Sequence, residues 1–237
     1  MSELECTVVY AMRMISVIIP AYNEEERIKD FLKTVQSRTL GNHEYIVAAG
    51  GTDNTANEAH KAGAIVVAGG PRPFALNSGA KVATGKILYF LHADTVPPKH
   101  WDQLILKAIE QGAQAGSFRL KFDNNHSLLS FFAWFTRFSW SLARFGDQSL
   151  FVTKAIYQKA NGFNEKMLVM EDSNIVRRLK KVTSFAVIPE QVITSARKYE
   201  KHGFYRLQCI YILVTILHYC RVPQNMIMRI YRGLLSN

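Results

Sequence analysis

Cysteine is scarce in this chain of 237 residues. The three cysteines, Cys6, Cys209 and Cys220, are odd in number, scattered along the sequence and never arranged as a Cys-x-x-Cys pair. A disulfide framework and a thiolate zinc site are therefore not indicated, and the pattern favours a reducing compartment. With 48% hydrophobic and 20% charged residues, the composition is typical of a globular protein and excludes a disordered or fibrous chain.

Long apolar segments are missing as well. The longest nearly apolar run, Cys209 to Leu217, falls well short of the roughly 18 residues that predict a membrane-spanning helix. Residues 1–14 show no basic segment followed by an apolar core and a small-residue cleavage site, so we expect no secretory signal. These absences predict a cytoplasmic protein, and any contact with a membrane is expected at its inner face.

Two common phosphate-binding motifs are absent. No Gly-x-Gly-x-x-Gly follows the first predicted strand, and no Gly-Lys-Ser or Gly-Lys-Thr occurs anywhere in the chain. Dehydrogenases that carry the dinucleotide fingerprint and P-loop NTPases are therefore disfavoured.

Acidic residues become rare toward the C-terminus. Residues 1–171 carry 18 basic and 16 acidic side chains, whereas residues 172–237 carry 11 basic and 3 acidic ones and supply +8 of the net charge of +10. Such a surface favours nucleic acid, an anionic membrane or a phosphorylated substrate, or it is simply solvated. We expect no nucleic acid partner, because no RNP-like or Gly-x-x-Gly cluster accompanies the charge.

Short β-branched runs alternate with helical patterns in the first hundred residues. Residues 15–19 indicate a buried strand that ends at Pro20, and the apolar residues at 28, 31, 32 and 35 recur at helical spacing after Asn23, a candidate N-cap. The further elements expected here are strands at 45–48, 64–67 and 87–91 and helices at 55–62 and 77–83. This alternation predicts an α/β fold, with a mostly parallel central sheet flanked by helices.

The second half of the sequence is less regular and more helical. Residues 127–145 indicate one continuous aromatic helix, and residues 204–221 indicate another apolar helix. No repeat, low-complexity tract or linker interrupts the chain, so we expect a single domain over residues 1–237 with a helical C-terminal part.

Polar residues follow three of the predicted strands. They are Pro20-Ala21-Tyr22-Asn23-Glu24, Gly50-Gly51-Thr52-Asp53 and His92-Ala93-Asp94-Thr95. Because ligands of parallel sheets collect beyond the carboxyl ends of the strands, we expect the three segments to converge on one rim.

These segments resemble the motifs of the family 2 glycosyltransferases, which have the GT-A nucleotide-diphospho-sugar transferase fold. Residues 17–24 are similar to the family's opening strand and base-binding turn, and His92-Ala93-Asp94 lies where the family has its Asp-x-Asp metal motif. Glu171-Asp172 matches its Glu-Asp motif. Further segments resemble a bacterial subgroup of this family. They are Asn77-Ser78-Gly79-Ala80, Phe90-Leu91-His92-Ala93-Asp94-Thr95, Gly146-Asp147-Gln148, Met170-Glu171-Asp172 and Thr194-Ser195-Ala196-Arg197. This ordered set extends over roughly residues 14–230 and is specific.

The resemblance implies an inverting enzyme that moves a sugar from a nucleotide-diphosphate donor to an acceptor hydroxyl. Residues 14–125 would form the nucleotide-sugar-binding half and residues 126–237 the acceptor-side half. Asp94 would hold a divalent cation, Mg²⁺ or Mn²⁺, that neutralises the diphosphate leaving group. Asp172 would be the general base that deprotonates the acceptor, with Glu171 in support. From the residues alone, capping a turn is the more common role for a residue such as Asp94, and opening a helix is the more common role for such an acidic pair.

The resemblance also assigns the remaining residues of the site. Nucleotide-sugar binding is expected of Pro20, Ala21, Tyr22, Glu24, Gly50, Asp53, Arg72, Asn77, Ala93 and Asp94. The acceptor or phosphate side is expected to include Gly146, Asp147, Gln148 and Arg197. Arginine suits a diphosphate because its planar fork donates two hydrogen bonds. The alternatives are that Arg72 is a solvated loop arginine, that Arg197 is a helix-end charge, and that Asn77 and Asp53 only cap helices.

Departures from the family pattern keep other functions open. Ala48 and Ala49 stand where the family usually has aspartates that help to hold the nucleoside, and His92 replaces the first aspartate of the metal motif. A degenerate member that binds a nucleotide sugar without transferring it is therefore one alternative, and an RNA- or membrane-binding protein is another.

The aromatic segment and the basic C-terminal part together predict contact with a membrane. Arg137 and Arg144 share a face of the helix expected at 127–145, and with the C-terminal charge they could seat it on anionic lipid. The acceptor would then be lipid-linked or otherwise amphiphilic. The alternative is that the aromatic residues form core.

Overall fold

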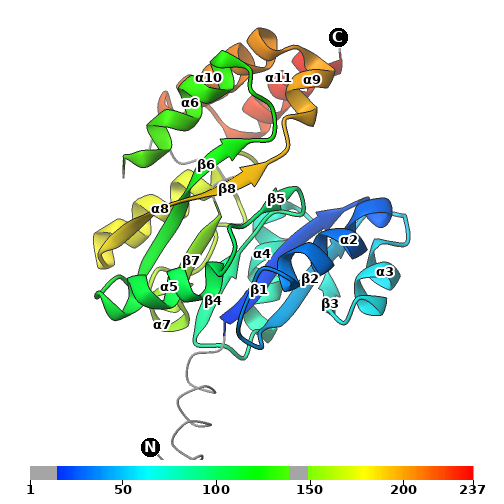
Figure 1. The fold of residues 1–237 in the computed structure, drawn as a ribbon. Coiled ribbons are helices and arrows are strands. Elements are labelled where there is room, and N and C mark those ends of the chain that lie inside the picture. The colour runs from blue at the N-terminus through cyan, green and yellow to red at the C-terminus, as the bar shows by residue number, and fades with distance from the viewer. Residues whose placement is uncertain (1–14, 139–148, 237) are drawn as a thin grey trace, which may run out of the picture.

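The computed structural model describes residues 15–138 and 149–236 (Figure 1). Within them one eight-stranded sheet has the order β3-β2-β1-β4-β7-β6-β8-β5. Its strands are β1 (Ile15–Tyr22), β2 (Glu44–Gly50), β3 (Ile65–Ala68), β4 (Ile87–Phe90), β5 (Thr95–Val96), β6 (Ala115–Phe122), β7 (Leu150–Thr153) and β8 (Phe185–Thr194). The first four strands pair in parallel with one another, and β6 pairs in parallel with β8, whereas β7 runs antiparallel to β4 and β6 and β5 runs antiparallel to β8. The predicted α/β fold with a mostly parallel sheet is confirmed.

Helices cover both faces of this sheet. They are α2 (Glu25–Gln36), α3 (Thr55–Lys61) and α5 (Trp101–Glu110) on one face and α4 (Arg72–Val82), α7 (Lys154–Lys159) and α8 (Glu171–Val182) on the other. Neighbouring residues of β1 belong to different cores: Val17 and Ile19 pack with α2 and α5, whereas Ile18 packs with α4. A strand buried on both faces needs apolar residues at every position, which explains its uninterrupted run.

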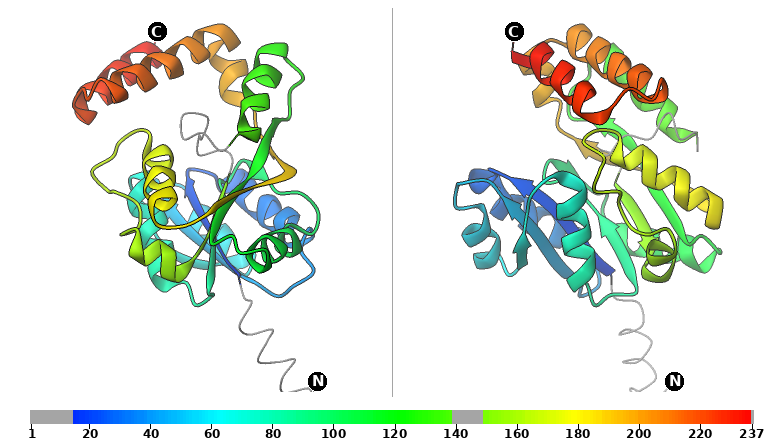
Figure 2. Two further views of the ribbon diagram at one scale, coloured as in Figure 1. Left: turned by 90° about the vertical axis from the view of Figure 1, so that its left-hand side faces the viewer. Right: turned by 180° about the vertical axis from the view of Figure 1, so that it is seen from behind.

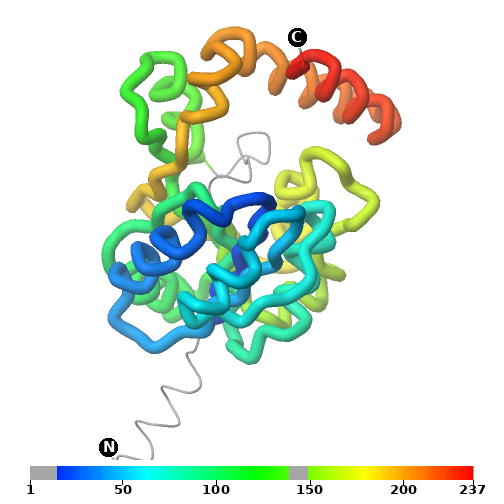
Figure 3. Tube along the Cα trace, turned by 90° about the vertical axis from the view of Figure 1, so that its right-hand side faces the viewer, coloured from blue at the N-terminus to red at the C-terminus, as the bar shows by residue number. Residues whose placement is uncertain are grey.

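The C-terminal helices form a separate layer beyond one end of the sheet (Figures 1 and 2). This layer consists of α9 (Arg197–His202), α10 (Phe204–Tyr219) and α11 (Gln224–Ser236), beside α6 (Ser127–Trp134). The segment before α8 reaches toward it (Figure 3), and the backbone N–H groups of Leu168 and Val169 donate to the side-chain oxygen of Gln224 at 2.9 and 3.1 Å. Across the described ranges, no helix has the length and hydropathy needed to cross a membrane.

Two helix predictions need correction. The helix expected at 77–83 begins at Arg72, with Pro73 in its first turn, where a missing N–H is tolerated. The aromatic helix expected at 127–145 ends at Trp134, and a 3₁₀ turn at Phe135–Arg137 follows. Thr136 marks this end, because its hydroxyl donates to the Ala133 carbonyl and accepts from the backbone of β6. The rest of that prediction lies outside the described residues.

Candidate active site

The turns after β1 and β2 are locked together by Asn23. Its backbone N–H donates to the Gly50 carbonyl at 3.3 Å, and its side-chain oxygen accepts from the Thr52 N–H at 3.0 Å. Gly51 has a φ of +104°, and a Cβ there would lie 1.9 Å from the Asn23 side-chain oxygen, so only glycine fits. Asn23 itself has a positive φ and does not cap α2, contrary to the sequence prediction.

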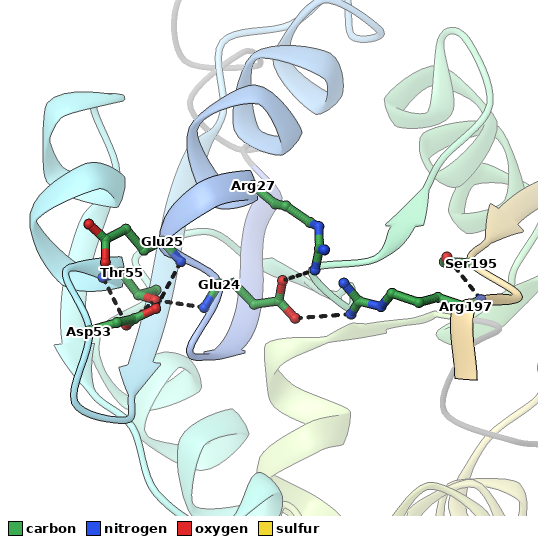
Figure 4. A network of polar contacts seen from close by, with 7 residues as sticks. All are labelled: Glu24, Glu25, Arg27, Asp53, Thr55, Ser195 and Arg197. Carbon is green, nitrogen blue, oxygen red and sulfur yellow. Dashed lines mark hydrogen bonds and ion pairs between the residues drawn. The ribbon is translucent and has the colours of Figure 1, made fainter. Parts of the chain in front are cut away.

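Asp53 serves both helices that begin at this rim. One carboxylate oxygen accepts from the N–H and hydroxyl of Thr55, at 3.1 and 2.6 Å, and the other accepts from the Glu25 N–H at 3.0 Å (Figure 4). The hydrogen bond from the Thr55 hydroxyl is the main cause of the lowered pKa of Asp53. The capping role left open by the sequence therefore describes this side chain, and it caps two helices.

Glu24 connects the rim to the C-terminal half. Its carboxylate lies between Arg27, at 3.4 Å, and Arg197 at the start of α9, at 3.5 Å (Figure 4). Burial raises the pKa of Glu24, Arg27 opposes this, and the neighbouring carboxylates of Asp94 and Asp53 raise it further. Glu24 and Asp94 are therefore close enough to repel each other, and a positive group between them would be favourable.

Asp94 follows β4 and meets the end of β8. Its backbone carbonyl accepts from the Ser195 N–H at 3.1 Å, and Thr95 pairs with Thr194 in the antiparallel contact of β5 with β8. His92 is 7% exposed, and burial, with help from Arg72 and Lys198, holds its pKa well below 6.5. The imidazole is therefore neutral at physiological pH, with a lone pair available on one nitrogen.

A cavity of about 370 Å³ lies between this edge of the sheet and the C-terminal layer. Its polar wall includes Arg72, Asp94, Glu171, Asp172, Ser195 and Lys198. The strand ends, the start of α8 and the start of α9 thus supply opposite charges to one space. Such an arrangement can bind an anion and a cation side by side.

Arg72 bridges to the acidic pair that opens α8. Its guanidinium lies 3.4 Å from Glu171 and 4.0 Å from Asp172. Met170, just before the helix, has a φ of 62°, and this turn places both acids in the first helical turn. An acidic helix start is therefore confirmed, and it does not exclude the catalytic role, because Asp172 also lines the cavity.

A divalent cation fits this site only if the ligand shares its coordination. Among the described residues, no three His, Cys, Asp or Glu side chains cluster closely enough to hold a metal ion. Magnesium and manganese sites in phosphoryl chemistry typically need only one or two carboxylates, because phosphate oxygens supply other ligands. Asp94 lines the cavity and meets that requirement.

Asn77, expected at the nucleotide, is hydrogen-bonded within the protein. The Asn77 amide donates to the Phe163 carbonyl and to Glu165, and its oxygen accepts from the Tyr157 hydroxyl and the Phe163 N–H. These contacts use all four hydrogen-bonding positions of the side chain. Because Asn77 lies inside α4, the N-cap alternative is wrong. Residues 146–148 lie outside the described ranges.

The rim residues of the first two turns differ in exposure. Ala21 is buried, whereas Tyr22 is 67% exposed and lies against Gly50, its partner in the register of β1 and β2. Pro20 has no N–H to give to β4, and the pairing of those strands ends before it, at Ile18 and Phe90. The chain of β4 is thereby free to turn away and present Ala93 and Asp94 at the rim.

Sequence reasoning missed Lys198 and most of the cavity's C-terminal wall. Gln208, Tyr211 and Thr215 of α10 line the cavity at spacings of three and four residues, as one helix face does. This stripe of polar and aromatic side chains in an otherwise apolar helix was the available signal.

Comparison with known proteins identifies the family. The family described as glycosyl transferase family 2 matches residues 16–155, more than half of the chain. The chain therefore belongs to glycosyl transferase family 2. No curated protein sequence matches it.

Solved structures share the GT-A fold at low sequence identity. The mannosyltransferase PcManGT from Pyrobaculum calidifontis, in complex with GDP-Man and Mn²⁺, has a TM-score of 0.69 at 18% identity over 87% of this chain and 63% of its own. Residues 1–349 of S. aureus TarS, in complex with UDP-GlcNAc, have a TM-score of 0.64 at 17% identity, over 86% of this chain and 66% of that one.

A third structure is glucosyl-3-phosphoglycerate synthase from Mycobacterium tuberculosis, in complex with Mn²⁺, UDP and glucosyl-3-phosphoglycerate. It gives a TM-score of 0.59 at 18% identity over 94% of this chain and 85% of its own. In a longer structure of TarS, the match spans only 40% of that protein.

Proposed function

We propose that this protein transfers a glycosyl group from a nucleotide-diphosphate sugar to an acceptor hydroxyl, with inversion at the anomeric carbon. The observation that carries the proposal is the single cavity that brings Asp94, Arg72 and Asp172 together in a member of glycosyl transferase family 2. Structures of the same fold with GDP-Man, UDP-GlcNAc and UDP support a nucleotide-sugar donor. Residues 14–125 would bind the donor, and residues 126–237 would form the acceptor side.

Asp94 would hold Mg²⁺ or Mn²⁺ together with the donor's diphosphate. The bound cation would neutralise the charge that develops on the leaving diphosphate. The Mn²⁺ in two structures of the same fold supports a divalent cation. Neutral His92, in place of an aspartate, lowers the negative charge beside Asp94, so the donor must supply more of the cation's anionic ligands.

Asp172 would accept the proton of the attacking acceptor hydroxyl. Its carboxylate is partly exposed to the cavity and lies at the N-terminus of α8, where the helix dipole favours the ionised form. Glu171 is more buried and nearer to Arg72, so it would fix the position of that arginine. Held there, Arg72 would present the rest of its planar guanidinium to the donor's diphosphate.

A turnover assay with a panel of donors tests the proposal. The nucleoside diphosphate released from UDP- and GDP-sugars would be measured with and without Mn²⁺, alongside binding of each donor by calorimetry. We expect at least one donor to bind and to be turned over only with the cation. Binding without release, even with varied acceptors, would favour the non-transferring alternative, and absence of any donor binding would refute both.

We also propose that the C-terminal layer seats the enzyme on an anionic membrane. The exposed face of α10 carries Tyr205, Ile212, Ile216 and Tyr219, and residues 197–236 hold seven basic side chains and one acidic one. In α6 only Leu129 is buried, while Phe131 and Trp134 are 58% and 47% exposed, so the aromatic segment is not ordinary core. Flotation with anionic vesicles that weakens with salt would support this contact. Failure to float at low salt would refute it.

A further inference from the structure

The cavity that contains Asp172 also has an apolar lining. Beyond the charged groups, this lining comes from β6, α6, the segment before α8, α10 and α11. Its apolar residues are Leu120, Phe122, Phe132, Leu168, Val169, Met170, Val214 and Met228, and we call this part the apolar arm. Leu120, Phe122 and Val214 are buried, whereas Phe132, Leu168, Val169 and Met228 are half-buried, so the arm lies partly in the folded interior.

Charge is segregated from the apolar arm. The segment 197–236 carries seven basic side chains, yet the lining residues contributed by α10 and α11 are all uncharged. Arg206 instead donates to the Leu234 carbonyl at 2.7 Å, on an exposed face. An anionic group of a ligand would therefore find its partners near Arg72 and Lys198 and not in the arm.

Polar groups beside the arm are already engaged within the protein. The Thr136 hydroxyl joins α6 to β6, Thr215 donates to the Tyr211 carbonyl at 2.8 Å, and the Tyr199 hydroxyl donates to Gln208 at 2.9 Å. A ligand hydroxyl buried beside these groups without a partner would cost about 1–3 kcal/mol. Hydrocarbon needs no hydrogen-bond partner, so it suits the apolar residues of the arm.

We infer that the acceptor is an amphiphile whose hydroxyl-bearing end lies at Asp172 and whose hydrocarbon portion occupies the apolar arm. The inference rests on the proposed function, because it takes Asp172 as the base. Asp172 and the arm line one continuous cavity, whose volume lies within the range of small-molecule sites. The reaction forms the bond from the acceptor oxygen to the anomeric carbon and breaks the bond to the diphosphate, while the acceptor proton passes to Asp172.

A chain-length series tests the arm directly. Methyl, butyl, hexyl and octyl glucosides would be titrated below their critical micelle concentrations, with binding followed by calorimetry. Each buried methylene is expected to tighten binding about fourfold until the arm is full. Equal affinity for the methyl and octyl compounds would overturn the inference.

Two substitutions on one helix give a matched control. Met228 lines the arm, whereas Met226 is 56% exposed on the same helix. Met228→Lys should remove the dependence on chain length and weaken octyl glucoside binding at least about tenfold, because a charge enters the arm. Met226→Lys adds the same charge outside and should leave the dependence unchanged. Equal effects of both variants would mean that the octyl chain adsorbs elsewhere and would overturn the inference.

A milder variant guards against misfolding of Met228→Lys. Val214→Thr keeps the side-chain volume while adding a hydroxyl. It should weaken octyl glucoside binding severalfold with little effect on the methyl compound, and an unchanged series would count against the arm. Donor binding is measured in parallel on every variant. If affinity does not change with chain length while donor binding is intact, this inference alone is refuted. If the wild-type protein neither binds nor turns over any donor, the proposed function is refuted.

Discussion

The two walls of the cavity are held by different interactions. The wall at the strand ends is a set of turns locked by hydrogen bonds, with Asn23 and Asp53 each joining two segments. The C-terminal wall is held mainly by apolar packing around Ile210, Val214 and Ile227. Hydrogen bonds fix polar groups in one geometry, as a diphosphate and a cation require, whereas apolar packing sets shape and excludes water.

The largest expected effect separates the walls by function. Asp172→Asn should lower transfer by about 10² to 10⁴-fold, because the amide cannot accept the acceptor's proton. The nucleotide's dissociation constant should change little, since the base acts on the acceptor. Steady-state kinetics and calorimetry on the same preparation measure the two quantities. Transfer at the wild-type rate would move the base elsewhere.

Asp94→Ala should act on the opposite side of the reaction. We expect donor binding in the presence of Mn²⁺ to weaken by about a hundredfold, while binding without the cation stays as in the wild type. Calorimetric titration of the donor with and without Mn²⁺ gives this difference. If the cation strengthens donor binding equally in both proteins, Asp94 is not its ligand.

The hydrogen-bonded wall should also be sensitive to a single methyl group. In Gly51→Ala an alanine would have to keep the positive φ of residue 51, and its Cβ would clash with the Asn23 side chain. We expect a loss of about 1–3 kcal/mol in the free energy of unfolding. Gly112→Ala is the control, because Gly112 also has a positive φ but would gain no close contact. Urea unfolding of both variants isolates the clash, and equal losses would show that only the backbone angle matters.

Acid should weaken the sheet half through a buried pair away from the cavity. His43 accepts from the Ile15 N–H with one nitrogen and contacts Asp102 with the other at 3.2 Å, so it fits as the neutral tautomer. Burial lowers the pKa of His43 despite the nearby carboxylate. Burial alone would raise the pKa of Asp102, but hydrogen bonds, including those from the Gly41 N–H at 2.8 Å and from His43, lower it to about 2.

Both shifts have the same sign for stability. A group whose pKa is lower in the folded than in the unfolded state stabilises the fold above its unfolded pKa, and this stabilisation is lost as the pH falls. The contribution of His43 therefore decreases as the pH drops below 6.5. The contribution of Asp102 decreases as the pH drops from 3.8 to about 2. For Asp102 this amounts to about 2 kcal/mol. Urea unfolding should show that the free energy of unfolding declines between pH 8 and 5. His43→Gln should reduce this decline, because glutamine offers a donor and an acceptor but does not titrate. Parallel curves would contradict the assignment.

The smallest effect should have the opposite sign and fall in the C-terminal wall. Gly233 lies in α11 with no atom within 4 Å of an added Cβ and without a positive φ. Gly233→Ala should raise the free energy of unfolding by about 0.5 kcal/mol, because alanine loses less backbone entropy in a helix. Thermal unfolding of the variant measures it, and a decrease would show that the end of α11 needs the small residue.

Several elements could be predicted from the sequence. The run at 15–19, the helix at 204–221 and the convergence of the strand-end segments follow from patterns within a few residues, and all three are present. The helix predicted at 77–83 starts earlier, at Arg72, because proline is favoured in the first helical turn and Pro73 lies there. The early end of α6, at Trp134, depends on a hydrogen bond between Thr136 and β6, which no local sequence pattern encodes.

By itself the sequence determined the alternation of strands and helices, the turns that require glycine and the family motifs, because these depend on short-range sterics and on the period of apolar residues. Only the tertiary structure decided which charges meet. Arg72 reaches Glu171 across 99 positions of sequence, and Arg197 reaches Glu24, because β7 and β6 lie between β4 and β8 and β8 pairs with β5. The apolar arm depends on the same arrangement. Its walls come from separate segments, so no single segment reveals the arm, and their meeting in one cavity with Asp172 follows from packing.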